Sequence, residues 1–296
     1  MILVFGGGGQ VGQEFSRLAR LRNIPLLALS RSQADIVDKN AVSSALQTHR
    51  PALVVNAAAY TKVDLAEDEP AAAHRANVVG AASVAEGCAA ADIPLVHIST
   101  DYVFDGQKTG AYVESDPVAP TGTYGATKAK GEDDVRRLAH MHLILRTAWV
   151  YGEFGHNFLK TILRLTRERD ELRIVADQRG SPTSTYDLAS AILSVAPVLM
   201  AKDAPWGTYH FAGSGITTWH GFAARIVAAQ APFTGRNPAL LPVTTEEFPT
   251  RARRPKNSAL DSELFARTFG IAPRPWPAQC DEATRALCEQ DRTAPC

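Results

Sequence analysis

The sequence predicts an α/β fold, in which a doubly wound parallel sheet carries a second, smaller lobe of mixed α and β structure. Short aliphatic runs bounded by turn residues alternate with longer stretches of helical periodicity through the first half of the chain. A cluster of glycines follows the first aliphatic run directly. After Tyr151 the alternation is lost, and from Ala204 onward Pro and Gly interrupt the chain frequently. This rhythm is typical of a parallel sheet with helices on both faces, followed by a lobe of different construction.

The first half of the chain supplies the elements of the sheet. We expect buried parallel strands at Ile2–Phe5, Pro25–Leu29, Ala52–Asn56, Pro94–Ser99 and His142–Arg146. We expect the intervening helices at Val11–Leu21, Lys39–His49, Ala71–Ala91 and Thr127–Ala139. Right-handed crossovers then place helices on both faces of the sheet. Ligands of such sheets bind at the carboxyl ends of the strands, so we look for site residues there.

The second half is expected to divide between the sheet and the lobe. A helix is predicted at Asn157–Arg167 and a strand at Leu172–Val175. We expect residues 1–151 to form the sheet domain, with roughly 186–214 returning to it. Residues 152–185 and 215–296 are then expected to form mainly the lobe.

Composition excludes several classes of partner. Of 296 residues, 31 are Lys or Arg and 31 are Asp or Glu, so no basic field attracts nucleic acid or an anionic membrane. No run approaches the ~18 apolar residues of a membrane span. The cysteines form no CxxC pair, and in a chain of this size buried thiols are expected rather than a disulfide framework: Cys88, Cys280, Cys288 and Cys296. These features predict a soluble cytoplasmic protein.

The glycine cluster predicts a dinucleotide site. Gly6, Gly9 and Gly12 fit G-x-x-G-x-x-G between the first strand and the first helix. Glycine permits the tight turn, lets a pyrophosphate approach the backbone and lets the helix pack close to the strand. Amides at the helix N-terminus would then bind the phosphates. In this context the motif indicates a Rossmann-type NAD(P)-binding domain; the alternative is a glycine-rich turn without a ligand.

The end of the second strand bears on the choice of cofactor. NAD sites usually have an acidic residue there, whereas NADP sites have a basic one for the 2′-phosphate. This chain has Ser30 and Arg31, which favours NADPH and leaves NADH open. Arg31 as a solvated surface residue is the alternative.

Tyr124 and Lys128 are the predicted catalytic pair. Their spacing places both side chains on one helix face. A nearby ammonium lowers a phenol pKa, as acid–base catalysis requires. Thr100, at the end of the fourth strand, could hydrogen-bond the substrate oxygen that changes in a hydride transfer. The alternatives are a turn or helix cap for Thr100 and Asp101, and a half-buried aromatic residue for Tyr124.

The longer motifs resemble one family. GGGGQVGQE, VVNAAAYTKVDLAEDEP, HISTDYVFDG, YGATKAKGE, LRTAWVYGEFGHNF, DQRGSPTST, TTWHGFAARI and PTRARRPKNSAL occur between residue 1 and about residue 260. These stretches resemble the dTDP-4-dehydrorhamnose reductase family of extended short-chain dehydrogenases/reductases. The resemblance implies NAD(P)H-dependent reduction at C4 of dTDP-4-dehydro-β-L-rhamnose, the last step towards dTDP-L-rhamnose, a sugar donor for lipopolysaccharide O-antigen.

The resemblance also implies roles for individual residues. Tyr124 would protonate the C4 alkoxide, Lys128 would tune Tyr124 and bind the ribose, and Thr100 would orient the carbonyl. Asp101 and Trp149 would belong to the substrate site, and a basic cluster suits a diphosphate unless it is a solvated charged turn: Arg251, Arg253, Arg254 and Lys256. Further residues match cofactor-contacting positions: Gly9, Gln10, Val11, Asp35, Ile36, Ala59, Tyr60 and Thr61.

One departure concerns a metal. Some members of the family form homodimers bridged by Mg²⁺ on three glutamates, and Glu14 and Glu289 match two of these by local pattern. Tyr186 stands at the third position, and tyrosine is a poor magnesium ligand. The metal-bridged homodimer is therefore doubtful, and both glutamates could be surface carboxylates.

Two rival functions remain open. Another nucleotide-sugar reductase, epimerase or dehydratase could use the same scaffold, although dehydratases have an Asp-Glu pair where this chain has Asp101 and Tyr102. A non-catalytic regulatory subunit of this fold is the rival from another class. Intact Thr100, Tyr124 and Lys128 favour an active enzyme.

Overall fold

The computed structural model describes residues 1–293, so Cys296 lies outside the described residues. A six-stranded sheet with the order β10-β5-β4-β3-β1-β2 forms the centre of the larger domain, and all its strand pairs are parallel. Its strands are β1 (Ile2–Phe5), β2 (Leu26–Leu29), β3 (Leu53–Asn56), β4 (Leu95–Thr100), β5 (His142–Thr147) and β10 (Gly207–His210). The predicted doubly wound α/β fold is confirmed.

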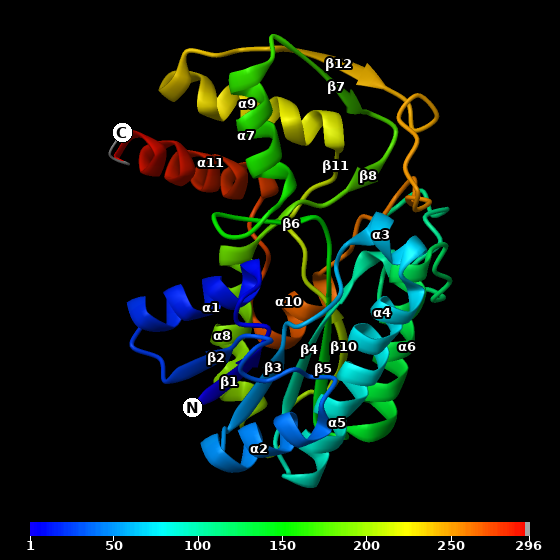
Figure 1. Cartoon of the computed structure of the whole chain (residues 1–296), viewed down its shortest axis with the longest axis vertical. Helices are drawn as coiled ribbons and strands as arrows, with labels where there is room; N and C mark the ends of the chain where they lie inside the picture. The colour runs from blue at the N-terminus through cyan, green and yellow to red at the C-terminus, as the bar shows by residue number, and fades with distance from the viewer. Residues whose placement is uncertain (294–296) are drawn as a thin grey trace.

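Helices cover both faces of this sheet (Figure 1). On one face lie α1 (Gln10–Leu21), α8 (Thr185–Leu199) and α10 (Glu263–Phe269); on the other lie α2 (Lys39–His49), α5 (Gly80–Ala90) and α6 (Thr123–Leu138). Successive residues of β1 alternate between two cores, with Ile2 and Val4 on the α1 side and Leu3 and Phe5 on the α2 side. Strands buried on both faces explain the continuous aliphatic runs in the sequence.

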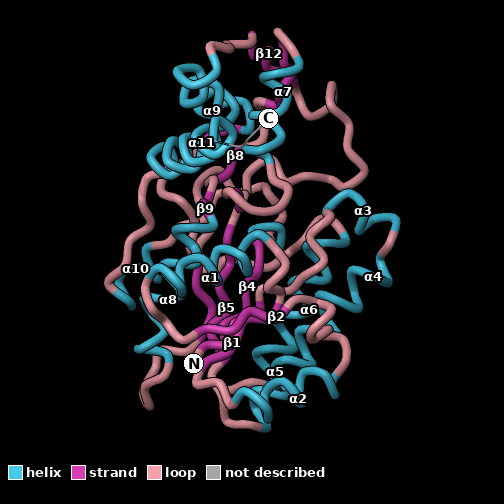
Figure 2. Tube along the Cα trace, turned by 60° about the vertical axis from the view of Figure 1, so that its left-hand side comes forward, coloured by secondary structure: helices cyan, strands magenta, loops and turns pink. Residues whose placement is uncertain are grey.

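The smaller lobe sits beyond the carboxyl ends of the strands (Figure 2). Its core joins α7 (Phe158–Glu168), α9 (Trp219–Thr234) and α11 (Trp276–Thr293), with Phe222 and Tyr151 fully buried among them. Short strand pairs complete it: β7 (Glu171–Val175) with β12 (Ala239–Val243), β8 (Arg179–Gly180) with β11 (Thr217–Thr218), and β6 (Val150–Tyr151) with β9 (Thr183–Ser184). Cys280 and Cys288 are buried free thiols of this core, as Cys88 is in the sheet domain. Within residues 1–293, no helix combines the length and apolar character needed to cross a membrane.

Two predicted helices differ from the structure. Residues 70–90 are helical throughout but divide into α4 (Pro70–His74), a π-helix (Arg75–Val79) and α5, preceded by α3 (Val63–Asp68). The helix predicted to begin at Thr127 begins at Thr123. Glu67 of α3 accepts hydrogen bonds from the amide (2.8 Å) and the hydroxyl (2.8 Å) of Thr123. This cap comes from a distant part of the sequence, so no local pattern could indicate it.

Candidate active site

The turn between β1 and α1 has the geometry of a phosphate-binding loop. Gly6 has φ +92°, and a Cβ there would lie 2.6 Å from the amide nitrogen of Ala58. A Cβ on Gly12 would lie 2.3 Å from the carbonyl oxygen of Gly6. The α1 helix begins at Gln10, and its N-cap residue, Gly9, supplies no side-chain cap. The first amides of α1 are therefore free to bind an anion.

A cavity of about 450 Å³ continues from this turn across the ends of β2 and β3. It brings together half of the predicted cofactor residues: Gly6, Gly9, Arg31, Asp35, Ile36, Ala59 and Tyr60. Arg31 pairs with Asp35 at 3.0 Å, and both remain accessible at the rim. Arg75, at the start of the π-helix, lines the same cavity and was not predicted. Small residues and a basic rim suit an adenosine phosphate.

Other predicted cofactor residues lie elsewhere. Gln10 and Thr61 line a larger cleft, where the Gln10 amide donates to the Val150 carbonyl at 3.3 Å. The Ser30 hydroxyl donates to Gln33 at 2.8 Å. Val11 packs on the sheet core, and its neighbour Gly12 provides the close helix–strand contact described above.

Thr100 and Tyr124 meet where β4 ends and α6 begins. The Thr100 hydroxyl donates to Asp101 at 2.9 Å and accepts from the Tyr102 amide at 3.2 Å. Burial raises the pKa of Tyr124 above its ordinary value; a hydrogen bond with Thr100 acts in the opposite direction, and the charges of Asp101 and Tyr102 add to the increase. A phenol that stays protonated at neutral pH is a proton donor, as reduction of a carbonyl requires.

Lys128 is almost completely buried, with 2% of its surface exposed. Its ammonium donates to the Ile98 carbonyl at 2.7 Å and lies 3.3 Å from His97 Nε2. Burial lowers the pKa of Lys128 to about 8, and Glu132 partly opposes this. The expectation that the lysine charge would bring the Tyr124 pKa below its ordinary value is therefore wrong for this structure. Burial dominates at both groups and disfavours the charged form of each.

Further along α6 from Tyr124 and Lys128, a buried ion pair anchors this helix to the sheet. Arg146 of β5 donates to Glu132 through Nε at 2.9 Å and through Nη2 at 2.7 Å. The Ser99 hydroxyl of β4 donates to the same carboxylate at 2.6 Å. These bonds fix α6, and with it Tyr124 and Lys128, against the carboxyl ends of two strands.

Asp101 and Trp149, two further predicted substrate residues, both contact Ser258. Burial raises the pKa of Asp101 to about 6, and hydrogen bonds from Ser258 and Thr100 limit the increase. Trp149 has φ +47° and donates through its indole N–H to Ser258 at 3.2 Å. Its ring stacks on Trp219 with centroids 3.6 Å apart and planes at 4°. Trp149 thus supports Trp219, which faces the cleft.

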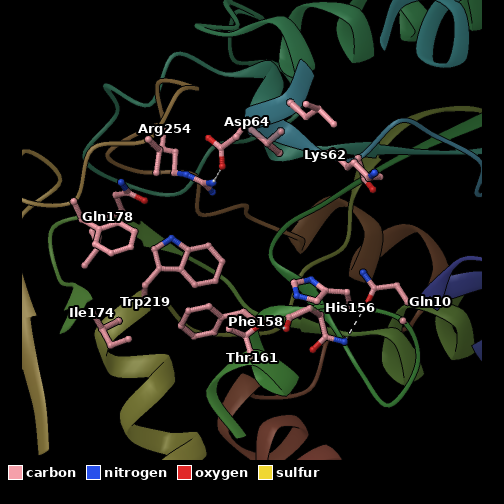
Figure 3. Close-up of a pocket in the computed structure, with 18 of the residues that line it drawn as sticks. Gln10, Lys62, Asp64, His156, Phe158, Thr161, Ile174, Gln178, Trp219 and Arg254 are labelled. Carbon is pink, nitrogen blue, oxygen red and sulfur yellow. Dashed lines mark hydrogen bonds and ion pairs between the residues drawn. The ribbon is translucent and has the colours of Figure 1, made fainter. Parts of the chain in front are cut away.

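A cleft of about 930 Å³ lies between the sheet domain and the lobe (Figure 3). The sheet side contributes Lys62 and Asp64, and the lobe contributes aromatic surface from Phe158 and Trp219. Arg254 donates to Asp64 at 2.7 Å and to the Tyr102 hydroxyl at 3.3 Å. Of the cleft residues, sequence reasoning identified only Arg254, Gly9, Gln10 and Thr61 as site residues. Trp219 lies in the quoted TTWHGFAARI stretch, which was the available signal for it.

Two groups of predicted site residues do not line this cleft. Arg253 is exposed and lines a neighbouring pocket with Arg251 and Lys256, which shares Thr250 and Arg254 with the cleft. Arg251 also pairs with Asp68. Among the described cleft-lining residues, none belongs to the Thr100–Tyr124–Lys128 group. Tyr102 connects the two, because its hydroxyl accepts from Arg254 and its ring packs 5.7 Å from that of Tyr124.

The two glutamates considered for a metal line different pockets of the chain. Glu14 is 1% exposed and accepts from Arg17 Nε at 2.9 Å. Glu289 lines a pocket between α9 and α11 together with Arg225 and Arg285. Across residues 1–293, no group of three or more His, Cys, Asp or Glu side chains is arranged to hold a metal ion.

A doubly wound sheet with a glycine turn after β1, a hydroxyl at the end of β4 and a Tyr-x-x-x-Lys pair on α6 defines the class of extended short-chain dehydrogenases/reductases. Within that class, the chain belongs to the RmlD substrate binding domain family, whose family model matches residues 1–288.

Known relatives agree over nearly the full length. The dTDP-4-dehydrorhamnose reductase of Aggregatibacter actinomycetemcomitans is 40% identical over 93% of this chain and 95% of its own. A solved dTDP-4-dehydrorhamnose reductase from Clostridium acetobutylicum matches with TM-score 0.89 and 37% identity, covering 97% of this chain and 99% of that one. The Bacillus anthracis enzyme, solved in complex with NADP, matches with TM-score 0.89 and 35% identity, covering 96% and 98%.

Proposed function

We propose that this protein reduces the C4 keto group of dTDP-4-dehydro-β-L-rhamnose to give dTDP-β-L-rhamnose, the last step of dTDP-L-rhamnose biosynthesis, with NADPH as reductant. The observation that carries the proposal is the placement of Thr100, Tyr124 and Lys128 at the β4–α6 junction of a chain about 40% identical to relatives of that name. NADH is the alternative cofactor.

The glycine turn and its adjoining cavity fit a dinucleotide phosphate. A Cβ on Gly6 would clash with the backbone of Ala58, so the turn requires glycine there, and the cavity rim carries Arg31 and Arg75. Two guanidiniums beside an adenosine site favour a 2′-phosphate, which supports NADPH. The NADP-bound Bacillus anthracis relative supports the same choice.

The protein side chains then supply everything except the hydride. When bound, NADPH supplies the hydride that C4 accepts, forming a new C–H bond. The Thr100 hydroxyl would turn its single proton from Asp101 to the C4 carbonyl oxygen and hold that oxygen in line. The Tyr124 phenol gives its proton to the same oxygen as the C=O bond becomes a C–O single bond. Lys128 would bind the nicotinamide ribose and stabilise the phenolate that remains.

The cleft would hold the rest of the substrate. Lys62 and Arg254 provide positive charge for a diphosphate, and the exposed face of the Trp219–Phe158 cluster suits a pyrimidine ring. Arg254 is a better candidate than Arg253, because only Arg254 lines this cleft. On this proposal the lobe is the substrate-binding part and residues 1–151 with 186–214 the NAD(P)-binding part.

Steady-state kinetics with Tyr124→Phe tests the proposal. We expect the wild type to consume NADPH with enzymatically generated dTDP-4-dehydro-L-rhamnose, faster than with NADH. Removing the proton donor should lower kcat by about 10²–10⁴-fold, since that is the usual contribution of a positioned general acid. NADPH affinity, measured by fluorescence titration, should stay close to that of the wild type.

The outcome separates the rivals. No turnover with either cofactor would exclude the reductase and favour a regulatory subunit of this fold. Turnover of a different sugar nucleotide, with the same dependence on Tyr124, would favour another reductase or epimerase on this scaffold.

A further inference from the structure

His97 of β4 lies directly under the predicted catalytic lysine and has no part in the mechanism given above. It is 1% exposed, and its two ring nitrogens each face one polar side chain. Nδ1 lies 3.2 Å from the Asn56 amide nitrogen, and Nε2 lies 3.3 Å from Lys128 Nζ. The tautomer of His97 therefore decides whether a hydrogen-bond donor or an acceptor faces the Lys128 amino group.

Asn56 fixes that tautomer. Its amide oxygen accepts a hydrogen bond from the backbone N–H of Ala58 at 3.1 Å. The amide therefore turns its NH₂ group, which can only donate, towards His97 Nδ1. Nδ1 must accept, so the proton of a neutral imidazole resides on Nε2. Ala58 also lines the cofactor cavity, which connects this chain of bonds to the dinucleotide site.

The proton on Nε2 then points at Lys128. An ammonium has three donors and no acceptor, whereas a neutral amine has a lone pair that can accept. Nε2–H thus favours the neutral amine and opposes the ammonium. The Ile98 carbonyl, 2.7 Å away, accepts from either form.

We propose that His97 is a positioning residue that, held by Asn56 in its Nε2–H tautomer, tunes the protonation of Lys128. The Nε2–H group acts on Lys128 in the same direction as burial, so that the buried lysine exchanges its proton near working pH. The kinetic consequence rests on the proposed function; the tautomer and its effect on Lys128 do not.

The charged groups around the pair agree with this arrangement. Burial places the pKa of His97 well below its ordinary value, and the charges of Lys128, His142 of β5 and Arg136 of α6 act in the same direction. The imidazole is therefore neutral at working pH. Glu132 on α6 raises the Lys128 pKa, but Arg146 of β5 and Arg136 already pair with that carboxylate. Tyr124, one turn earlier on α6, is neutral because burial raises its pKa.

The first test uses NMR and needs no substrate. Spectra of ¹⁵N-histidine-labelled protein should show His97 as the Nε2–H tautomer, neutral over the range in which exposed histidines titrate. In ¹³C-lysine spectra the Lys128 midpoint should lie near pH 8, the value that burial gives its pKa. A wild-type His97 that carries its proton on Nδ1 would overturn the proposal.

Two substitutions should both raise the Lys128 midpoint. His97→Gln places a rotatable amide near the lysine, whose oxygen can accept from the ammonium. Asn56→Leu removes the donor to Nδ1 and lets His97 take the Nδ1–H tautomer, which turns an acceptor towards Lys128. We expect an upward shift of about one pH unit for each. His210→Gln is the matched control, because His210 is equally buried but lies 3.4 Å from Arg146.

Kinetics give an independent readout. The alkaline limb of kcat for ketone reduction should move upward with the Lys128 midpoint in His97→Gln and Asn56→Leu, and stay in place in His210→Gln. If kcat falls while the alkaline limb of its pH profile and the Lys128 midpoint both stay in place, His97 has a purely structural role. That result would refute the proposal that His97 tunes the protonation of Lys128. If one variant fails to fold, the other variant and the wild-type tautomer decide. A wild type without turnover would count against the proposed function alone, since the NMR result stands without it.

Discussion

Asp101 of the site lowers the stability of the folded protein when its buried carboxyl group is ionised. It is 3% exposed, and burial raises its pKa from 3.8 to about 6. Between about pH 4 and pH 6 the folded protein therefore keeps a proton that the unfolded chain has released. Stability falls as the pH rises through this window, and above pH 6 the cost stays constant.

We expect Asp101→Asn to stabilise the protein above pH 6, because the amide cannot ionise. The gain should be on the order of 3 kcal/mol in the free energy of unfolding at pH 8 and should vanish near pH 4. Urea unfolding at several pH values measures it. Asp105→Asn is the control: Asp105 accepts from Tyr112 and the Gln107 amide, which lower its pKa, so that variant should gain nothing at high pH. Equal stability of Asp101→Asn and wild type at pH 8 would contradict the raised pKa.

The site residues that sequence reasoning found are those marked by local spacing. Tyr124 and Lys128 are four residues apart, and Thr100 follows a strand, so the pattern contains their relation. His97 and Arg75 gain their roles only from their neighbours in the fold. Asn56 lies beside His97, and Arg75 lines the same cavity as Arg31. Nothing in their immediate sequence distinguishes them from an ordinary strand histidine and an ordinary helix arginine.

At the scale of elements, the π-helix at Arg75–Val79 joins two parts of the site. Its Asn77 accepts from the Tyr60 amide at 2.8 Å and donates to the Tyr60 carbonyl at 3.2 Å and the Thr127 hydroxyl at 3.1 Å. A Cβ on Gly131 of α6 would lie 2.2 Å from the Asn77 carbonyl oxygen, so the two helices are in close contact. Asn77 thus fixes the cofactor loop after β3 and the helix of Tyr124 relative to each other.

We expect Asn77→Ala to lower the free energy of unfolding by about 2–3 kcal/mol, because it leaves the Tyr60 amide and carbonyl without their partner. It should also weaken NADPH binding, since Tyr60 lines the cofactor cavity. Thermal unfolding and fluorescence titration measure the two effects. Asn40→Ala, on the exposed first turn of α2, should change neither. A stable Asn77→Ala with normal NADPH affinity would show that the π-helix does not organise this site.

Strand positions were predictable because buried parallel strands are continuous aliphatic runs, and the five predicted strands fall within one residue of the observed ends. The start of α6 was not predictable, because Gly122 and Gly125 resemble the residues of a turn. Gly125 is in fact required for packing, since a Cβ there would lie 2.1 Å from the Tyr102 carbonyl oxygen. The lobe was hardest to predict, because β6, β8, β9 and β11 have two residues each and exist only through their partners.

At the scale of the whole molecule, the surface around Glu14 bears on assembly. Arg17 and Arg274 each lie 5.7 Å from the centre of the Tyr186 ring, one on α1 and the other before α11. Arg274 also pairs with Asp187 and Glu282. Glu14 already has a cationic partner in Arg17, and burial raises its pKa. A divalent cation there would lie beside two guanidiniums and a tyrosine side chain in place of a third carboxylate.

We therefore expect the assembly of this protein to be independent of Mg²⁺. Its mass in sedimentation equilibrium and its Tm should be the same with EDTA and with excess Mg²⁺, because Arg17 neutralises Glu14 without a metal. Arg17→Ala with Tyr186→Glu should create metal dependence, since it removes the competing cation and restores a carboxylate ligand. The single variant Tyr186→Phe, which keeps the ring and both arginine contacts, should behave as the wild type. A wild-type mass that falls on addition of EDTA would contradict this account and show that a metal joins copies of the chain through carboxylates that lie apart within one copy.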